Sequence, residues 1–326
     1  MGFWDWLRQL LQGPGPQERK PDLTPPVDGK KLEELAKRLD FSVDQLHAVQ
    51  VSYRQFSIPK RSGNGFRTIS VPNPELKEMQ RRILRRLLGR LQTHPAAMGF
   101  EPGQSIATNA AYHVGADVVV RMDIRDFFGA TVTNRVRAYF YGIDWGKEAT
   151  DVLVRLCTYE RGLPQGAPTS PRLSNLVNFE LDARLDGYAQ KIGARYTRYA
   201  DDITFSFNFA EIKQTLTGQN SKILEHIKDK SKSSYVIHQT IRMTKRILFE
   251  YGYQIHTKRK LNIRRKHQCQ KVTGLVVNHK VALPRKTRRR LRAVEHHLAN
   301  DRPATLTHEQ LAGWKALQYM IETQTK

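Results

Sequence analysis

The chain has 326 residues, of which 39% are hydrophobic, so it can build a sizeable core in two or three lobes and is not disordered throughout. Lys and Arg number 54 against 31 Asp and Glu, which gives a formal net charge of +23. An excess of this size is more than solubility requires and favours a polyanionic partner, nucleic acid above all, with an anionic membrane surface as the alternative.

The N-terminal segments predict helices separated by a linker. Residues 3–11 form a short amphipathic pattern with two Trp, and residues 12–29 are rich in Pro and Gly. Two uses of the first helix stay open: docking on a partner or membrane face, or packing back onto its own protein. A helical hairpin is expected over 30–51, because Ser42 followed by Gln45 is a capping-box pattern.

Alternating and apolar segments predict the remaining elements. A β-hairpin is expected where 57–61 and 66–71 flank a Ser-Gly-Asn-Gly turn. Further strands are predicted at 117–124, 195–199, 203–207 and 271–277, and further helices at 74–91, 132–141, 147–159, 174–192, 284–298 and 307–323. Residues 208–250 are mixed and polar. In the strand 203–207, Ile203 and Phe205 share one face and Thr204 the other, as in a half-buried strand.

The basic residues are clustered in three places. One predicted helix carries Arg81, Arg82, Arg85, Arg86 and Arg90, and two further runs cover 258–266 and 285–292. Each run alone is explained as well by an exposed charged face. Three runs on one strongly basic chain favour nucleic acid.

Cysteine usage and hydropathy set further limits. Cys157 and Cys269 form no CxxC pair, which argues against structural zinc and fits a reduced, cytoplasmic setting. No apolar run approaches the roughly 20 residues that span a bilayer, and no signal peptide is recognised. We therefore expect a cytoplasmic protein without a membrane association.

The stretch Tyr199-Ala200-Asp201-Asp202 joins the two alternating segments 195–199 and 203–207, so the acid pair is expected at the turn of a β-hairpin. A solvated turn is the ordinary explanation, because Asp is common in turns. Asp123 supplies a third carboxylate at the end of a buried strand. Together Asp123, Asp201 and Asp202 offer enough hard oxygen ligands for two Mg²⁺ (magnesium) ions, the arrangement that serves phosphoryl transfer.

A Pro- and Gly-rich loop lies between these acids in the sequence, at 161–171. Gly166 would let the backbone approach a nucleotide closely, and Gln165 could contact the sugar or base of that nucleotide. A plain loop that opens the next helix is the alternative.

The order of these features resembles the palm of a reverse transcriptase, with its A, B and C motifs in sequence. The resemblance implies an α+β right-hand polymerase fold with fingers, palm and helical thumb, dNTP substrates, and metal binding by Asp123, Asp201 and Asp202. It also implies that Gln165 is the motif-B glutamine. In the family, the aromatic residue at the position of Phe128 clashes with a ribose 2′-OH and so favours deoxynucleotides.

Phosphate-handling residues follow from the same resemblance. Lys60 and Arg67, on the predicted hairpin, correspond to residues that hold the triphosphate. The segment 252–258 resembles a motif that ends in a lysine near the leaving pyrophosphate; this is assigned to Lys258, with Lys260 as the alternative register.

Two short elements narrow the resemblance to retron reverse transcriptases. Asn109-Ala-Ala-Tyr-His113 matches their Asn-Ala-x-x-His element, and Val272-Thr273-Gly274 matches their Val-Thr-Gly element. These residues are expected to bind nucleic acid, as is the basic helix with Arg285, Arg288, Arg289 and Arg292, which would read RNA by its shape.

The retron resemblance implies a cognate structured non-coding RNA that serves as template and primer. Synthesis would start from the 2′-OH of a guanosine and give branched RNA–DNA (msDNA). It also implies an effector or toxin protein, a role in anti-phage defence, and possible higher-order assembly with the RNA and the effector.

The expected domains are an extension at 1–29, fingers at 30–114, a palm at 115–270 with a polar insertion at 208–250, and a thumb at 271–326. Gly129 stands where the family commonly has Pro. The segment after the acid pair is expected to be longer than in short retron enzymes, and the thumb is expected to be short. Two alternatives remain: another bacterial reverse transcriptase, group II intron-like or diversity-generating, and a non-catalytic RNA-binding scaffold with a relict palm.

Overall fold

The computed structural model describes residues 17–60, 65–210, 230–256 and 261–325. The helix expected at 3–11 lies outside these residues, as does Lys258. None of the described helices combines the length and the apolar character that crossing a bilayer requires.

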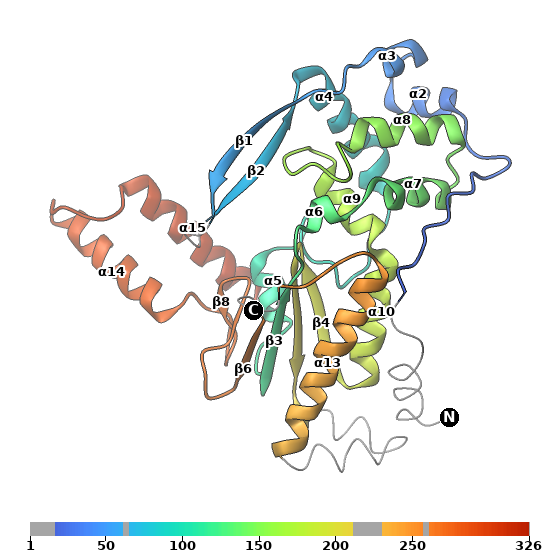
Figure 1. The fold of residues 1–326 in the computed structure, drawn as a ribbon. Coiled ribbons are helices and arrows are strands. Elements are labelled where there is room, and N and C mark those ends of the chain that lie inside the picture. The colour runs from blue at the N-terminus through green and yellow to red at the C-terminus, as the bar shows by residue number, and fades with distance from the viewer. Residues whose placement is uncertain (1–16, 61–64, 211–229, 257–260, 326) are drawn as a thin grey trace.

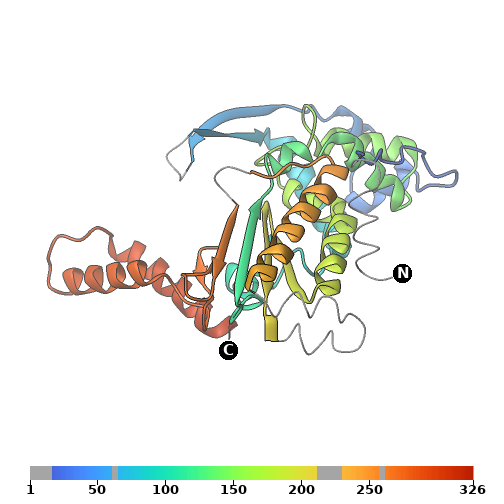
Figure 2. The same cartoon turned by 60° about the horizontal axis from the view of Figure 1, so that its bottom comes forward.

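A four-stranded antiparallel sheet lies at the centre, with the strand order β4–β5–β3–β6. Its strands are β3 (Val118–Asp123), β4 (Ala194–Tyr199), β5 (Asp202–Phe207) and β6 (Asn262–Arg265). The first three confirm the predicted strands, whereas β6 falls in a run that was interpreted only as a basic cluster. Two helices, α10 (Phe179–Lys191) and α13 (Lys230–Glu250), cover one face of this sheet (Figures 1 and 2).

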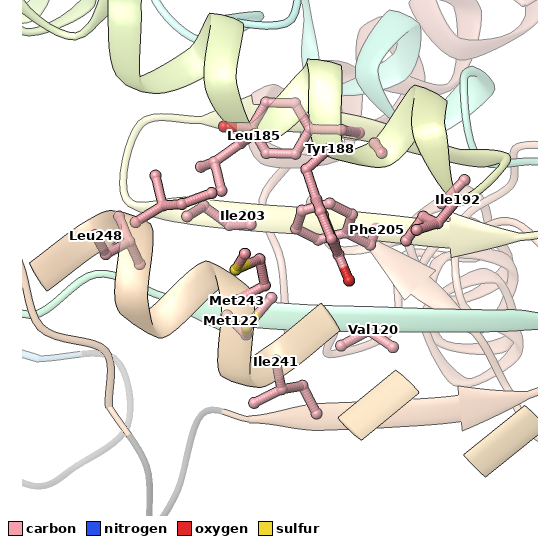
Figure 3. Close-up of a cluster of buried hydrophobic side chains, with 14 of the residues drawn as sticks. Val120, Met122, Leu185, Tyr188, Ile192, Ile203, Phe205, Ile241, Met243 and Leu248 are labelled. Carbon is pink, nitrogen blue, oxygen red and sulfur yellow. The ribbon is translucent and has the colours of Figure 1, made fainter. Parts of the chain in front are cut away.

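The main core forms between the sheet and these two helices. Val120 and Met122 of β3 and Ile203 and Phe205 of β5 point toward α10 and α13, and all four are fully buried (Figure 3). The helices contribute residues such as Leu185, Tyr188, Ile241, Met243 and Leu248. Each large apolar side chain buried in this way stabilises the fold by about 1.5–3 kcal/mol. This burial determines which face of the sheet the helices cover and which face stays free of them.

Helix α13 corrects the expectation that 208–250 is mixed and polar. Residues 230–250 form one helix of 21 residues. Its apolar residues recur at helical spacing and are buried against the sheet: Val236, Ile237, Ile241, Met243, Ile247 and Leu248. Polar residues between these positions hid the pattern: some are exposed, whereas Thr240 and Thr244 are themselves fully buried.

The helix expected over 174–192 is two helices. They are α9 (Ser170–Val177) and α10, with a break at Asn178. The Asn178 amide donates to Ser174 O at 2.7 Å and to the Tyr253 hydroxyl at 2.9 Å. These bonds satisfy a polar side chain that is fully buried at the break.

A second core belongs to an N-terminal lobe of helices. It contains α2 (Leu32–Leu39), α3 (Val43–Ala48), α4 (Pro74–Arg82), α7 (Thr133–Gly142), α8 (Lys147–Cys157) and α9. The capping box of Ser42 and Gln45 is present. The long basic helix does not stay α-helical: after α4 it becomes a π-helix, η1 (Ile83–Leu87), and then a 3₁₀ turn, η2 (Leu88–Arg90).

A two-stranded hairpin projects from this lobe, as predicted. It consists of β1 (Tyr53–Pro59) and β2 (Phe66–Pro72), with Ile58 opposite Arg67 and Pro59 opposite Phe66. Figures 1 and 2 show the hairpin reaching beyond the helices of the lobe toward the side where the C-terminal helices lie.

The C-terminal part forms a third core. The strand expected at 271–277 is a small hairpin instead, with β7 (Lys271–Val272) and β8 (Leu275–Val276) joined by a two-residue turn. Both turn residues have positive φ, 47° at Thr273 and 88° at Gly274, as a tight hairpin turn requires. Helices α5 (Ile106–Ala111), α14 (Arg285–Ala299) and α15 (His308–Gln324) pack around it.

The cores draw on segments that are distant in the sequence. Residues of α7, α8 and α9 complete the N-terminal core, and residues of α5 complete the C-terminal one. The bounds 30–114, 115–270 and 271–326 stay a prediction.

The polar face of the sheet is sealed at its far end by His113. Thr204 and Ser206 are each only 2% exposed, so β5 is buried on both faces rather than half-buried. The fully buried His113 ring hydrogen-bonds to Ser206 Oγ through Nδ1 and to Thr197 Oγ1 through Nε2, both at 2.7 Å. His113 therefore fastens the segment after α5 onto strands β4 and β5.

Burial makes His113 a source of pH-dependent stability. Burial, together with the nearby charge of Arg195, lowers the pKa of the His113 imidazole to about 3. An unfolded histidine titrates near 6.5, so between pH 6.5 and 3 the unfolded chain binds one proton more than the folded chain. The contribution of His113 to the free energy of unfolding is fully present above pH 6.5 and is lost as the pH falls toward 3.

We expect this histidine to lower the free energy of unfolding by about 2 kcal/mol between pH 7 and pH 5. Urea unfolding at both pH values measures the difference. His113→Gln should lose this part of the pH dependence, and substitution of the exposed His308 by Gln is the matched control. Equal pH dependence in the wild type and His113→Gln would contradict the assignment.

Candidate active site

Asp123 and Asp202 meet at one end of the central sheet. Asp123 is the last residue of β3 and Asp202 the first of β5, and the two are directly opposite each other in the antiparallel register. The Ile124 N–H donates to Asp201 O at 2.8 Å and closes the sheet just beyond this pair. The structure thus brings the three predicted carboxylate residues to one strand end.

The turn that carries Asp201 is tight and strained. Tyr199 pairs with Asp202, so only Ala200 and Asp201 connect β4 to β5. Ala200 has φ +56°, a conformation that residues other than glycine rarely adopt. A neighbouring chain segment lies against the turn, because a Cβ on Gly99 would approach Ala200 N to 2.6 Å.

Two basic side chains already contact these acids. Arg121 Nη2 lies 3.2 and 3.1 Å from the two carboxylate oxygens of Asp202, and Arg121 Nη1 donates to Lys271 O at 3.5 Å. His256 Nε2 lies 3.6 Å from Asp123 Oδ1, and the His256 N–H donates to Asp123 O at 2.9 Å. Arg121 was missed from the sequence, although residues 121 and 123 share a face of any strand.

The donor set fits Mg²⁺ by its chemistry. Mg²⁺ prefers oxygen ligands and commonly takes only one or two carboxylates, with water and substrate phosphates completing its shell. Within the described ranges, no group of three or more His, Cys, Asp or Glu side chains is arranged to hold a metal ion. Asp123 and Asp202 are nevertheless register partners, with Asp201 adjacent, so one strand end supplies carboxylates of the right type.

The Gln165-Gly166 loop docks on strand β2. The Ser70 N–H donates to Gln165 O at 2.8 Å, and Gln165 is half-buried. Gly166 has φ +126°, and a Cβ at this position would lie 2.8 Å from Ser70 O. Only glycine combines this conformation with so close an approach. The loop is therefore fixed to the same strand that carries Arg67, and both Arg67 and Lys60 are exposed on the hairpin.

Phe128 lies between the two larger cores. It belongs to the short helix α6 (Phe127–Ala130), is half-buried, and packs against both hydrophobic clusters. Its ring centroid is 5.5 Å from that of Phe127 and 6.0 Å from that of Phe100. Its carbonyl accepts from the Leu163 N–H at 3.2 Å, which ties α6 to the start of the Gln165 loop.

Three residues of the Asn-Ala-x-x-His and Val-Thr-Gly elements are buried, whereas Thr273 is half-buried and Gly274 is exposed. Asn109, His113 and Val272 are at most 1% exposed. Thr273 Oγ1 donates to Ile106 O at 2.8 Å, so the Thr273-Gly274 turn is attached to the start of α5. Burial leaves no room for direct nucleic-acid contacts from the side chains of Asn109, His113 and Val272. His113 bonds to the sheet, and Val272 packs in the C-terminal core beside Val119 of β3.

The basic residues of α14 do lie on the surface. Leu291 and Val294 face the core, whereas the expected RNA-reading residues are exposed: Arg285, Arg288, Arg289 and Arg292. In the other basic helix, charge is partly balanced by Glu78 and Asp40, which pair with Arg81, Arg82, Arg85 and Arg86.

Comparison with known proteins identifies the family. Residues 58–275 match the model of the reverse transcriptase (RNA-dependent DNA polymerase) family. The retron Ec86 reverse transcriptase of Escherichia coli is 33% identical over 90% of this chain and 85% of its own length. The retron Mx162 and Mx65 reverse transcriptases of Myxococcus xanthus are each 35% identical, and the chain covers 64% and 61% of their lengths.

Among solved structures, telomerase from Candida albicans with a fragment of telomeric RNA aligns with a TM-score of 0.48, at 11% identity over 78% of this chain and 49% of that chain. The family match confirms the expected α+β right-hand polymerase fold with fingers, palm and helical thumb. The chain belongs to the reverse transcriptase family, and within it to the retron reverse transcriptases.

Proposed function

We propose that this protein copies a dedicated structured non-coding RNA into DNA, using that RNA as both template and primer. The observation that carries the proposal is the pairing of Asp123 with Asp202 at one strand end, beside Asp201, in a chain of the retron family. The first nucleotide would be joined to the 2′-OH of a guanosine, and the product would be branched RNA–DNA (msDNA).

Asp123, Asp201 and Asp202 would hold the Mg²⁺ ions. When bound, these ions supply charge neutralisation at the phosphates and activation of the attacking hydroxyl. The chain's own residues would orient the substrate: Lys60 and Arg67 on the hairpin would contact the dNTP triphosphate, and Lys258, which lies outside the described residues, is assigned to the departing pyrophosphate. Fixed cations of this kind stabilise charge that develops during transfer.

Residues in and near the Gln165-Gly166 loop would select the sugar and contact the nucleotide. Phe128 would exclude a ribose 2′-OH, and Gln165 would contact the incoming nucleotide, with Gly166 allowing close backbone approach. The bonds from Ser70 to Gln165 and from Leu163 to Phe128 support this assignment, because they hold both residues on one connected framework.

The partners follow from the same family. The exposed arginines of α14 would bind the cognate RNA by its shape, since side chains cannot read the deep, narrow major groove of A-form RNA and mostly contact its phosphates and 2′-hydroxyls. We further propose a cytoplasmic role in anti-phage defence with an effector or toxin protein, and assembly of the enzyme with its RNA and that effector.

Replacement of both turn acids tests the catalytic assignment. Asp201→Asn with Asp202→Asn should reduce DNA synthesis on the co-expressed RNA at least about a hundredfold, because two of the three carboxylates lose their charge. Ribonuclease-resistant, debranching-sensitive DNA on a denaturing gel is the measurement. Asp117→Asn, just before β3 and next to Phe207 at the opposite end of β5, is the matched control. DNA made at the wild-type level by the double variant would refute the mechanism and favour a relict palm that binds RNA.

Phe128→Ala tests the sugar gate. The smaller side chain should admit ribonucleotides and lower the preference for dGTP over GTP by about tenfold or more, measured as the ratio of kcat/KM values. Phe100→Ala removes the neighbouring ring and should leave the preference unchanged. A preference that survives in Phe128→Ala would exclude Phe128 as the gate.

Gly166→Ala tests the docked loop. The new Cβ meets Ser70 O and the φ of +126° is strained for alanine, so stability should fall by about 1–3 kcal/mol and KM for dNTPs should rise. Thermal melting and single-nucleotide incorporation measure the two effects. Gly187→Ala, at an open position inside α10, should instead be neutral or slightly stabilising. Identical behaviour of the two variants would show that the loop's close approach has no role.

A further inference from the structure

A completely buried ion pair lies directly behind the turn that carries Asp201 and Asp202. Arg198, in β4, and Asp182, in α10, both have fully buried side chains. Arg198 Nη2 is 2.6 Å from Asp182 Oδ2 and Arg198 Nε is 2.8 Å from Asp182 Oδ1, a two-bond arrangement. The Tyr196 hydroxyl also donates to Asp182 Oδ1 at 2.8 Å. The carboxylate is thus held from two sides.

The guanidinium has a third bond, and that bond goes to the turn. Arg198 Nη1 donates to Ala200 O at 3.1 Å. Ala200 is the residue in the strained conformation, and its carbonyl belongs to the peptide that leads into Asp201. The Arg198 side chain therefore reaches forward along its own hairpin and bonds to a turn residue that lies outside the β4–β5 pairing.

Further contacts link Arg198 to segments outside its own hairpin. The Arg198 N–H donates to Ala96 O and the Met98 N–H donates to Arg198 O, both at 2.8 Å. The Arg198 guanidinium also lies over the Phe127 ring, 5.2 Å from its centroid. Phe127 begins the helix that follows Asp123, so Arg198 touches both segments that deliver the carboxylates.

Stability alone does not account for this pair. Taking two charges out of water is costly, and apolar residues of similar volume usually stabilise a core as well as a buried ion pair does. A bidentate pair needs only two of the guanidinium's bonds. The third hydrogen bond, to the Ala200 carbonyl, is not needed for the ion pair or for filling the core.

We propose that Arg198 is a positioning residue for the catalytic turn: its bond to the Ala200 carbonyl holds Asp201 and Asp202 in place, and Asp182 holds the guanidinium that makes this bond. The inference rests on the proposed function of the two acids. It assigns to Arg198 no contact with the substrate.

Two variants separate positioning from packing. Arg198→Met with Asp182→Leu removes both charges and fills the space with apolar atoms, so its melting temperature should lie close to that of the wild type. Arg198→Lys keeps a cation for Asp182 but lacks the fork that also reaches Ala200. Both should lower kcat by about 10- to 100-fold, since small misplacements of reacting groups have effects of this size. KM for dNTPs should change much less.

A second readout does not depend on activity. Mn²⁺ binding to the protein without substrate, followed by electron paramagnetic resonance, should weaken by about tenfold in both variants, because the turn carboxylates are no longer held together. Arg184→Met is the matched control. It breaks an ion pair between α10 and Glu250, which keeps Arg19 and Arg246 as partners, and it does not reach the turn.

Wild-type kcat and wild-type Mn²⁺ binding in either stably folded variant would overturn the inference. Equal losses in Arg184→Met would also overturn it, since general destabilisation would then explain the effect. If the wild-type protein itself makes no DNA on its RNA, the proposed function fails, while the Mn²⁺ measurement still decides whether Arg198 organises the acids.

Discussion

The antiparallel pairing of β3 with β5 is the constraint on which the rest of this structure depends. Because side chains alternate along a strand, this register places Val120, Met122, Ile203 and Phe205 on the face covered by helices. The same register makes Asp123 and Asp202 direct neighbours. A slip of one residue would turn the apolar set outward and separate the acids at once. Selection for a packed core therefore also maintains the site.

The opposite face of the sheet has two parts: one half is buried under neighbouring segments, and the other end carries the candidate site. Near the far strand ends, His113 seals Ser206 and Thr197 under the segment that follows α5. At the other end lie Asp123, Asp201 and Asp202. The Thr273-Gly274 turn, bonded to Ile106, joins the C-terminal helices to the sealed half. The two retron elements thus act as a joint between the sheet and the helices that carry the basic surface.

Local patterns in the sequence predicted the elements with clear periodicity. Strands β3, β4 and β5 could be recognised because apolar residues alternate or run together, and the acids could be placed because they end these strands. β6 was missed because its four residues, Asn262–Arg265, lie in a basic run and include two arginines and a single apolar residue. Helix α13 was missed because its buried residues are interleaved with polar ones, so only the neighbouring sheet reveals which side is buried.

Contacts across the sheet could not be predicted from the sequence, for a different reason. The bond of Arg121 to Asp202 depends on the register of two strands that are far apart in the sequence. The burial of His113 depends on hydroxyls from two further strands, and a histidine in a short motif carries no sign of its surroundings. The bond of Arg198 to Ala200 likewise needs the position of Asp182 on α10.

The Arg121–Asp202 contact affects how a metal ion would enter the acid cluster. Like charges about 4 Å apart repel by about 4 kcal/mol at the effective dielectric near a protein surface, so an adjacent cation reduces the cost of keeping the carboxylates together. In the proposed function, Asp202 would exchange this guanidinium for a metal ion. Metal binding would then be a competition between Arg121, which is part of the chain, and a free ion, and Arg121 would raise the metal concentration needed to fill the site.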